Sequence, residues 1–163
     1  IAKPQAAGNN HRIIGDDVAW DGDGWSFGVT SGIMRFTRNG IIDADDPSGT
    51  AIPTGQWVHI AATPTSTGIN FYLNGVLTGT NANGSDNNTG LGNNGVADVY
   101  GIGRSYGNAQ DQFFPGLIDE IRVYDTVLTQ SEIANLATAV PEPSAGLLIG
   151  LAGLAAAMRR RRA

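Results

Sequence analysis

Short apolar runs alternate with turn-forming residues along most of this chain. The runs WSFGV (25–29) and IMRF (33–36) flank Thr30-Ser31-Gly32 and predict a β-hairpin. In WVHIAAT (57–63), Trp57, His59 and Ala61 fall on one face, and Val58, Ile60 and Ala62 fall on the other. Because neither face is strongly polar, we expect this strand to be covered on both sides, as in the interior of a sandwich.

The clearest local signal is the segment INFYLNGVLTGT. It divides into Ile69–Leu73 and Val76–Thr80 around Asn74-Gly75, a pair that tolerates positive φ at both turn positions. Further strands are predicted at Val96–Gly103 and Phe114–Asp125, after an exposed polar loop at 81–95. These segments predict an all-β chain.

Alternation along Phe114–Asp125 places every second residue on the same face. One face would carry Leu117, Asp119, Ile121 and Val123. After this strand, Thr129 and Glu132 have the spacing of a capping box, and Ile133 and Leu136 form an apolar stripe. We therefore expect a short helix to close the domain.

Composition supports the same class. The chain has 163 residues, enough for one domain, and its 23 glycines favour strands joined by many turns. It contains no cysteine, which excludes a disulfide framework and thiolate metal sites. Residues 1–140 hold six basic and fourteen acidic side chains, a net charge of −8, so this part should repel nucleic acid and anionic membranes.

The carboxyl-terminal end has three distinct parts. Pro141, Glu142 and Pro143 precede an apolar run, 145–158, which is followed by Arg159, Arg160, Arg161 and Arg162. Fourteen helical residues rise about 21 Å, less than the roughly 30 Å of a bilayer core, so the run is a marginal span. The four arginines should stop it in the membrane with their charges on the cytoplasmic side. The alternative is a buried helix with a basic end.

The order VPEP, apolar run, arginine cluster and chain end resembles the PEP-CTERM sorting signal. This resemblance implies export and tail removal by an exosortase-like membrane protease that reads Pro141, Glu142 and Pro143. It implies transient inner-membrane contact, then delivery to the cell surface or extracellular matrix. At the other end, IAKPQ has no initiator Met, basic region or apolar region, so we expect the sequence to start after any secretory signal peptide.

A second resemblance covers residues 25–136. The succession WVHIAAT, FYLNG, IGR, FPGLIDEIRVYD and LTQSEI is similar to the laminin-G-like, concanavalin A-like jelly roll. This implies a jelly-roll β-sandwich at 1–138, a short C-terminal helix, and then the hydrophobic sorting helix within 139–163. Ile1-Ala2-Lys3-Pro4 resembles the end of an early family strand, so we expect the domain to be N-terminally truncated.

Catalytic chemistry is not indicated. Glycoside hydrolysis needs two placed carboxylates, but the only glutamates before the tail are Glu120 and Glu132. The Glu-x-Asp-x-x-Glu strand of the superfamily's glucanases does not occur here. His11 and His59 lack a nearby nucleophile or metal-ligand spacing, and we interpret His59 as a packing residue. The chain is therefore predicted not to be an enzyme.

Asp119 is the candidate metal ligand. An inward carboxylate needs a cation or hydrogen bonds to offset desolvation. Related jelly rolls often use the Asp of such a strand to hold Ca²⁺, so the resemblance implies calcium as the cofactor candidate. The alternatives are a hydrogen-bonded structural Asp or an ion pair with Arg122 or Arg104.

Glycan binding needs an exposed aromatic ring and polar groups that bond hydroxyls. Trp20, Tyr106 and Asn88 lie in polar segments and are the candidate ligand-binding residues. The alternatives are aromatic lids over the core edge and, for Asn88, a solubilising linker.

These observations predict an exported, non-catalytic surface module that binds glycan, exopolysaccharide or a surface partner, and that does not bind nucleic acid. Two alternatives stay open. One is a structural extracellular matrix protein without a defined ligand, and the other is an accessory domain of a glycoside hydrolase.

Overall fold

The computed structural model describes residues 1–5, 10–16, 24–38, 41–84, 100–104 and 112–138. The strands are β1 (Ala2–Pro4), β2 (His11–Asp16), β3 (Trp25–Thr30), β4 (Ile33–Arg38), β5 (Ile42–Asp45), β6 (Ile60–Thr65), β7 (Gly68–Leu73), β8 (Val76–Asn81), β9 (Tyr100–Ile102) and β10 (Gly116–Ile118). A 3₁₀ helix, η1 (Ala82–Gly84), follows β8, and an α-helix, α1 (Gln130–Thr138), ends the described chain.

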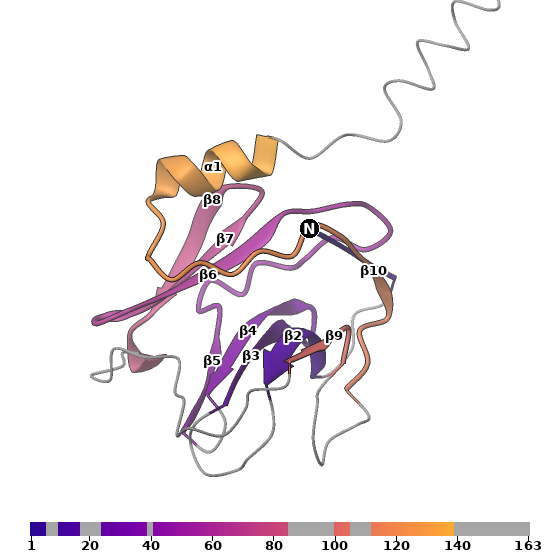
Figure 1. The fold of residues 1–163 in the computed structure, drawn as a ribbon, viewed down its shortest axis with the longest axis horizontal. Coiled ribbons are helices and arrows are strands. Elements are labelled where there is room, and N and C mark those ends of the chain that lie inside the picture. The colour runs from indigo at the N-terminus through magenta and orange to yellow at the C-terminus, as the bar shows by residue number, and fades with distance from the viewer. Residues whose placement is uncertain (6–9, 17–23, 39–40, 85–99, 105–111, 139–163) are drawn as a thin grey trace, which may run out of the picture.

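The strands form two sheets and one separate pair. The five-stranded sheet has the order β5-β4-β3-β2-β9, the three-stranded sheet has the order β6-β7-β8, and β1 pairs with β10. Figure 1 shows the three-stranded sheet lying between the five-stranded sheet and α1. The expected all-β sandwich with a short C-terminal helix is therefore confirmed, whereas the sorting helix within 139–163 lies outside the described residues.

The core lies between the two sheets and follows from alternation along the strands. On β3 and β4, Trp25, Phe27 and Phe36 point inward, and the Trp25 and Phe36 rings stack with centroids 5.8 Å apart. From the opposite sheet, Ile69 and Phe71 of β7 are almost fully buried in the same cluster. Burying aromatic and branched side chains on facing sheets supplies the main stabilisation of such a sandwich.

Two local predictions, the Asn74-Gly75 turn and the capping box of the helix, are confirmed by the structure. Asn74 and Gly75 both have positive φ, 51° and 79°, and join β7 to β8 as a tight hairpin. At the start of α1, the Glu132 carboxylate accepts hydrogen bonds of 2.7 Å from both the backbone N–H and the hydroxyl of Thr129. The capping box thus forms as the sequence predicted.

A buried carboxylate ties the two sheets together at the end of β5. Asp46 is 2% exposed, and its Oδ2 accepts a 2.6 Å hydrogen bond from the Thr78 hydroxyl on β8. Its Oδ1 accepts hydrogen bonds from the backbone N–H and hydroxyl of Ser48. These donors compensate the desolvation of the charge.

The predicted strand at Phe114–Asp125 is wrong over most of its length. Only β10 is a strand, and beyond it Glu120 has a φ of +51°, which interrupts the alternation of an extended chain. Ile118 and Ile121 pack on the core, while Leu117 and Val123 are more than half exposed. The strand predicted at Val96–Gly103 is confirmed at β9 (Tyr100–Ile102), and residues 96–99 lie outside the described residues. β2 and β5 were not predicted.

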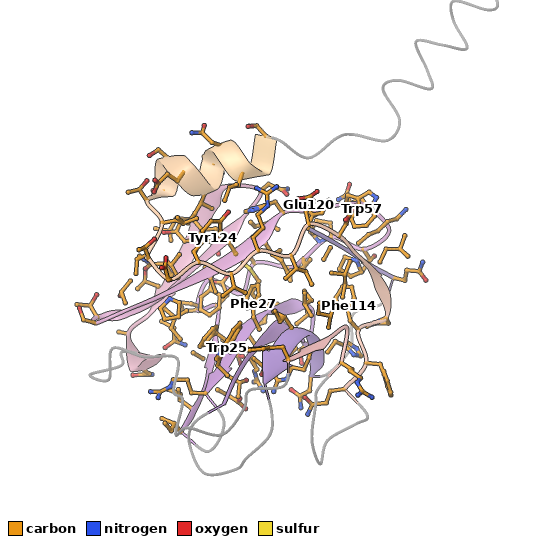
Figure 2. All side chains as sticks on the ribbon, viewed as in Figure 1. Trp25, Phe27, Trp57, Phe114, Glu120 and Tyr124 are labelled. Carbon is orange, nitrogen blue, oxygen red and sulfur yellow. The ribbon has the colours of Figure 1, made fainter. Side chains whose placement is uncertain are left out.

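The sandwich is not filled between β6 and residues 120–128. A cavity of about 760 Å³ lies there, lined by β6, this segment and inward aromatics such as Trp25 and Phe27 (Figure 2). We call it the β6 slot. His59 lines it, and burial lowers the pKa of His59 from its ordinary 6.5 to about 4, with smaller contributions from the positive charges of the Ile1 amine and Arg122.

The first prediction concerns the Asn74-Gly75 turn. A Cβ on Gly75 would lie 2.8 Å from the Ala134 Cα of α1, in addition to requiring a left-handed backbone. Gly49 also has positive φ but open space around it, and so is the matched control. Gly75→Ala should lower the free energy of unfolding by about 2–4 kcal/mol and Gly49→Ala by about 1 kcal/mol, measured by urea unfolding. Equal losses would contradict the packing of α1 on this turn.

The second prediction concerns pH. In the unfolded chain His59 takes up a proton near its ordinary pKa of 6.5, whereas in the folded chain it does so only near pH 4. Between pH 4 and 6.5 the unfolded state therefore binds more protons than the folded state. The His59 contribution to stability should therefore be full above about pH 6.5 and should fall as the pH drops towards 4. His59→Gln should flatten this part of the pH dependence of the urea midpoint. An unchanged profile would show that His59 is not desolvated.

Candidate functional site

The face of the five-stranded sheet opposite the core is polar. In β3 and β4 the residues between the inward aromatics are small or polar, and strand pairing aligns them across the sheet. Arg12 lies opposite Gly28, Gly28 opposite Arg35, and Arg35 opposite Asp45, while Ser26 lies opposite Thr37, and Thr37 opposite Asp43. We call Arg12, Ser26, Gly28, Arg35, Thr37, Asp43 and Asp45 the polar sheet face.

Arg35 organises one end of the polar sheet face. Its guanidinium donates to both carboxylate oxygens of Asp45, with Nη2 2.9 Å from Oδ2, and Nη1 lies 3.0 Å from Asp43 Oδ2. The hydrogen bond with Asp45 is the main cause that raises the pKa of Arg35 further above its ordinary value. A bidentate pair of this kind fixes the orientation of the carboxylate.

Arg12 extends this network towards β2. It is 7% exposed, and it donates to the Thr37 hydroxyl at 3.0 Å and to the Gln112 amide oxygen at 2.8 Å. Thr37 in turn donates to Asp43 Oδ1 at 2.7 Å. The hydrogen bonds thus run from Arg12 through Thr37 and Asp43 to Arg35, in one connected network.

The two aspartates of this network remain accessible. The side chains of Asp43 and Asp45 are 48% and 39% exposed, whereas Arg35 is 18% exposed. Carboxylate oxygens have more than one lone-pair direction, so both residues can accept additional hydrogen bonds from a ligand. Nearby, the Ser26 hydroxyl is buried and has no hydrogen-bond partner among the described residues. The face therefore presents fixed, partly exposed acceptors.

This network was not predicted. Its only signal in the sequence is alternation: Arg35 and Thr37 lie between Met34, Phe36 and Arg38, and Asp43 and Asp45 flank Ala44. The predicted ligand-binding residues Trp20, Tyr106 and Asn88 lie outside the described residues. So do the sorting motif Pro141, Glu142 and Pro143 and the membrane-stop residues Arg159, Arg160, Arg161 and Arg162. The division into domains at 1–138 and 139–163 stays a prediction.

Asp119 does not point into the sandwich, contrary to the sequence prediction. It is exposed, because it shares the outward face of the chain with Leu117, while Ile118 packs on the core. Its Oδ1 accepts a 2.8 Å hydrogen bond from the backbone N–H of Glu120. The neighbouring Glu120 carboxylate is paired with Arg122 at 2.7 Å. Calcium needs six to eight oxygen ligands, and no group of three or more potential ligand side chains occurs in the described part of the chain. Backbone carbonyl oxygens can complete such a site, so the calcium hypothesis at Asp119 stays a prediction.

Models of two protein families match the chain. The model described as the concanavalin A-like lectin/glucanases superfamily, Laminin_G_3, matches residues 2–134, and the PEP-CTERM protein-sorting motif matches residues 139–162. The sorting motif indicates export to the cell surface or extracellular space and implies processing by an exosortase. Within the described residues, no helix combines the length and apolar character needed to cross a membrane. No match was found among curated proteins.

Two solved structures share the fold. Domain 4 of AbnA, a GH43 extracellular arabinanase from Geobacillus stearothermophilus, in complex with arabinotriose, is 26% identical with a TM-score of 0.59. The heptameric SAP-like pentraxin from Limulus polyphemus is 20% identical with a TM-score of 0.61. The matches cover 83% of this chain in both cases, and 63% and 66% of those chains.

The two resemblances seen in the sequence are thereby confirmed. The first family model spans most of the chain, and its fold agrees with the sandwich of β-sheets. This chain belongs to the concanavalin A-like lectin/glucanases superfamily and carries a PEP-CTERM sorting motif at its carboxyl end.

Proposed function

We propose that this protein is a non-catalytic, exported module that binds glycan through the polar sheet face. The observation that carries this proposal is the similarity to domain 4 of the arabinanase, whose structure contains arabinotriose. At 26% identity over 83% of this chain, the similarity supports a related use of the fold. This chain spans only 63% of that structure, so the particular sugar bound there is not carried over. We propose the ligand as a class, an oligosaccharide built of furanose or pyranose units.

The chemistry of the polar sheet face suits such a ligand. Sugar hydroxyls are good donors, and Asp43 and Asp45 offer accessible carboxylate acceptors. Arg35 holds both carboxylates in place before a ligand arrives, which reduces the entropy lost on binding. Hydrogen bonds to charged acceptors are about twice as strong as neutral ones, so a few of them suffice for selective binding.

The described glutamates support a role without catalysis. A general acid in glycoside hydrolysis needs a raised pKa and a partner carboxylate about 5–10 Å away across the bond. Glu132 instead caps α1, and its hydrogen bonds from Thr129 lower its pKa. Glu120 is exposed and paired with Arg122. Glu132 therefore serves as a helix cap and Glu120 is held by an arginine, and we propose recognition alone as the activity.

The third prediction tests the glycan site. Asp43→Asn and Asp45→Asn each replace one charged acceptor while keeping the shape of the side chain. Each should weaken binding of arabinotriose, or of the best ligand on a glycan array, by about tenfold, because a charge-assisted hydrogen bond contributes about 1.5–3 kcal/mol. Binding is measured by calorimetry on the 163-residue protein.

The control is Asp125→Asn, an exposed acid in the segment after β10, which should bind the ligand as the unsubstituted protein does. Urea midpoints confirm that each variant is folded. Saturable binding that survives both substitutions would place the site elsewhere on the molecule. No saturable binding to any glycan would favour a structural matrix protein.

The fourth prediction concerns the tail. We propose that residues 145–158 contact the inner membrane transiently while an exosortase cleaves near Pro141-Glu142-Pro143. Substituting these three residues by alanine should abolish tail removal in cells that contain an exosortase, as shown by intact mass. Ser144→Ala, next to the motif, should leave processing intact. Cleavage of the triple variant would refute recognition through the motif.

A further inference from the structure

The hydroxyl proton of Thr37, in the middle of the polar sheet face, has a fixed direction. Arg12 Nη1 lies 3.0 Å from Thr37 Oγ1, and Thr37 Oγ1 lies 2.7 Å from Asp43 Oδ1. A guanidinium has only N–H donors, so the Thr37 hydroxyl accepts from Arg12, and its single proton is directed to the carboxylate. Thr37 therefore has no proton left for a ligand.

The donors of Arg35 are also directed into the network. Its Nε and Nη2 donate to the two carboxylate oxygens of Asp45. Its Nη1 donates to Asp43 Oδ2 and, at 3.1 Å, to Asn10 Oδ1, which also accepts a 3.2 Å hydrogen bond from the Thr30 hydroxyl. Four of the five N–H bonds of the guanidinium are thereby used.

Acceptors dominate the accessible part of the polar sheet face. The side chains of Asp43 and Asp45 are more exposed than those of Arg35 and Arg12. An ionised carboxylate has no proton and can accept about four hydrogen bonds. Each of the two carboxylates accepts two bonds from the network, so each keeps lone pairs for a ligand. The exposed carboxylates can accept hydrogen bonds but cannot donate them.

Ser26 gives an independent indication that a further polar group is bound here. It lies opposite Thr37 in the β3–β4 ladder, and Thr37 lies opposite Asp43 in the β4–β5 ladder, so the three residues form one row across the sheet. Ser26 is 2% exposed, and its hydroxyl has no partner among the described residues. Buried polar atoms in native proteins are nearly always hydrogen-bonded, so this row lacks one bonding partner.

A free sugar hydroxyl suits this arrangement. It has one proton to donate to a carboxylate of Asp43 or Asp45, and a bond to a charged acceptor is about twice as strong as a neutral one. Its oxygen can accept a bond in return. Among the described residues, the fifth N–H of Arg35 and the amide nitrogen of Asn10 have no partner, and both residues adjoin these carboxylates.

Two kinds of substituent on a glycan would remove this match. Acylation replaces the hydroxyl proton by an ester, which has only acceptors and would bring its carbonyl oxygen against a carboxylate. A uronic acid would bring a further negative charge towards Asp43 and Asp45, and like charges exclude a partner. A site built to bind a hydroxyl strongly rejects an analogue that lacks the proton.

We propose that the polar sheet face distinguishes free hydroxyls from substituted ones, so that it binds neutral, unsubstituted glycan and excludes glycan that is acylated or carries uronic acids. This inference rests on the proposed glycan site and adds the chemical class of its ligand. Acylation of the glycan would then release the protein without any change in the protein itself.

The fifth prediction compares chemical forms of one oligosaccharide. The probe is arabinotriose, or the neutral oligosaccharide that a glycan array selects, and calorimetry gives its Kd for the 163-residue protein. The O-acetylated probe should bind at least about tenfold more weakly than the free probe. Replacing single hydroxyls by fluorine, which is close to a hydroxyl in size but has no proton, should cause a similar loss at one position or more. A galacturonic acid trimer should bind more weakly still.

Two substitutions test whether the carboxylates make this distinction. Asp43→Asn and Asp45→Asn each bring an N–H donor to the face and remove a charge. Each should reduce the preference for the free over the acetylated probe by about threefold or more, because the new amide can donate to the ester. Asp125→Asn removes the same charge from an exposed site outside the face and should leave the preference unchanged.

Several outcomes would overturn this inference and leave glycan binding itself intact. Equal Kd values for the free and acetylated probes would refute it, as would binding of the galacturonic acid trimer as tight as that of the neutral probe. A loss on acetylation without a loss in any fluorinated form would show that size, not the proton, is decisive. An unchanged preference in both Asp→Asn variants would assign the distinction to other groups. By contrast, no saturable binding of any form would refute the proposed glycan site.

Discussion

Alternation along the central hairpin of β3 and β4 is the constraint on which the other features depend. It sends Trp25, Phe27 and Phe36 into the core and leaves Ser26, Arg35 and Thr37 on the opposite side of the same sheet. A shift of one residue in this pairing would bury the arginine and expose the aromatics, so the register is strongly determined. The core and the candidate ligand-binding face are thus the two opposite faces of one sheet, and the same alternation of residues produces both.

Local signals in the sequence predicted local structure well. The positive φ values at Asn74 and Gly75 and the Thr129–Glu132 cap depend on neighbouring residues, and both were found as expected. The failure after Ile118 has a physical cause, since Glu120 adopts a left-handed backbone that a residue pattern does not reveal. β2 and β5 were missed because HRIIGD and IDAD contain charged or small residues that become strand residues only through their neighbours.

The candidate site was harder to predict than the fold. Asp43, Asp45, Arg35 and Arg12 come from three strands, and only long-range pairing brings them into one network. Asp119 was predicted to point inward because the face of Leu117 was assigned to the core, whereas Ile118 is the residue of β10 that packs there. Binding on a polar sheet face would differ from binding in a deep apolar cleft. The selectivity of such a polar face depends on how rigidly its hydrogen-bond acceptors are held. In this protein the arginine partners provide that rigidity.

The position of α1 has a mechanical consequence. The sorting tail begins directly after this helix, so any tension on a tethered carboxyl end passes first through α1 and then into the Asn74-Gly75 turn, where Ala134 packs. Pulling would peel a single short helix, anchored mainly by the buried Ile133, before it reached the ladders of the sandwich. The helix would then detach first, while the sheets and their polar face stay folded.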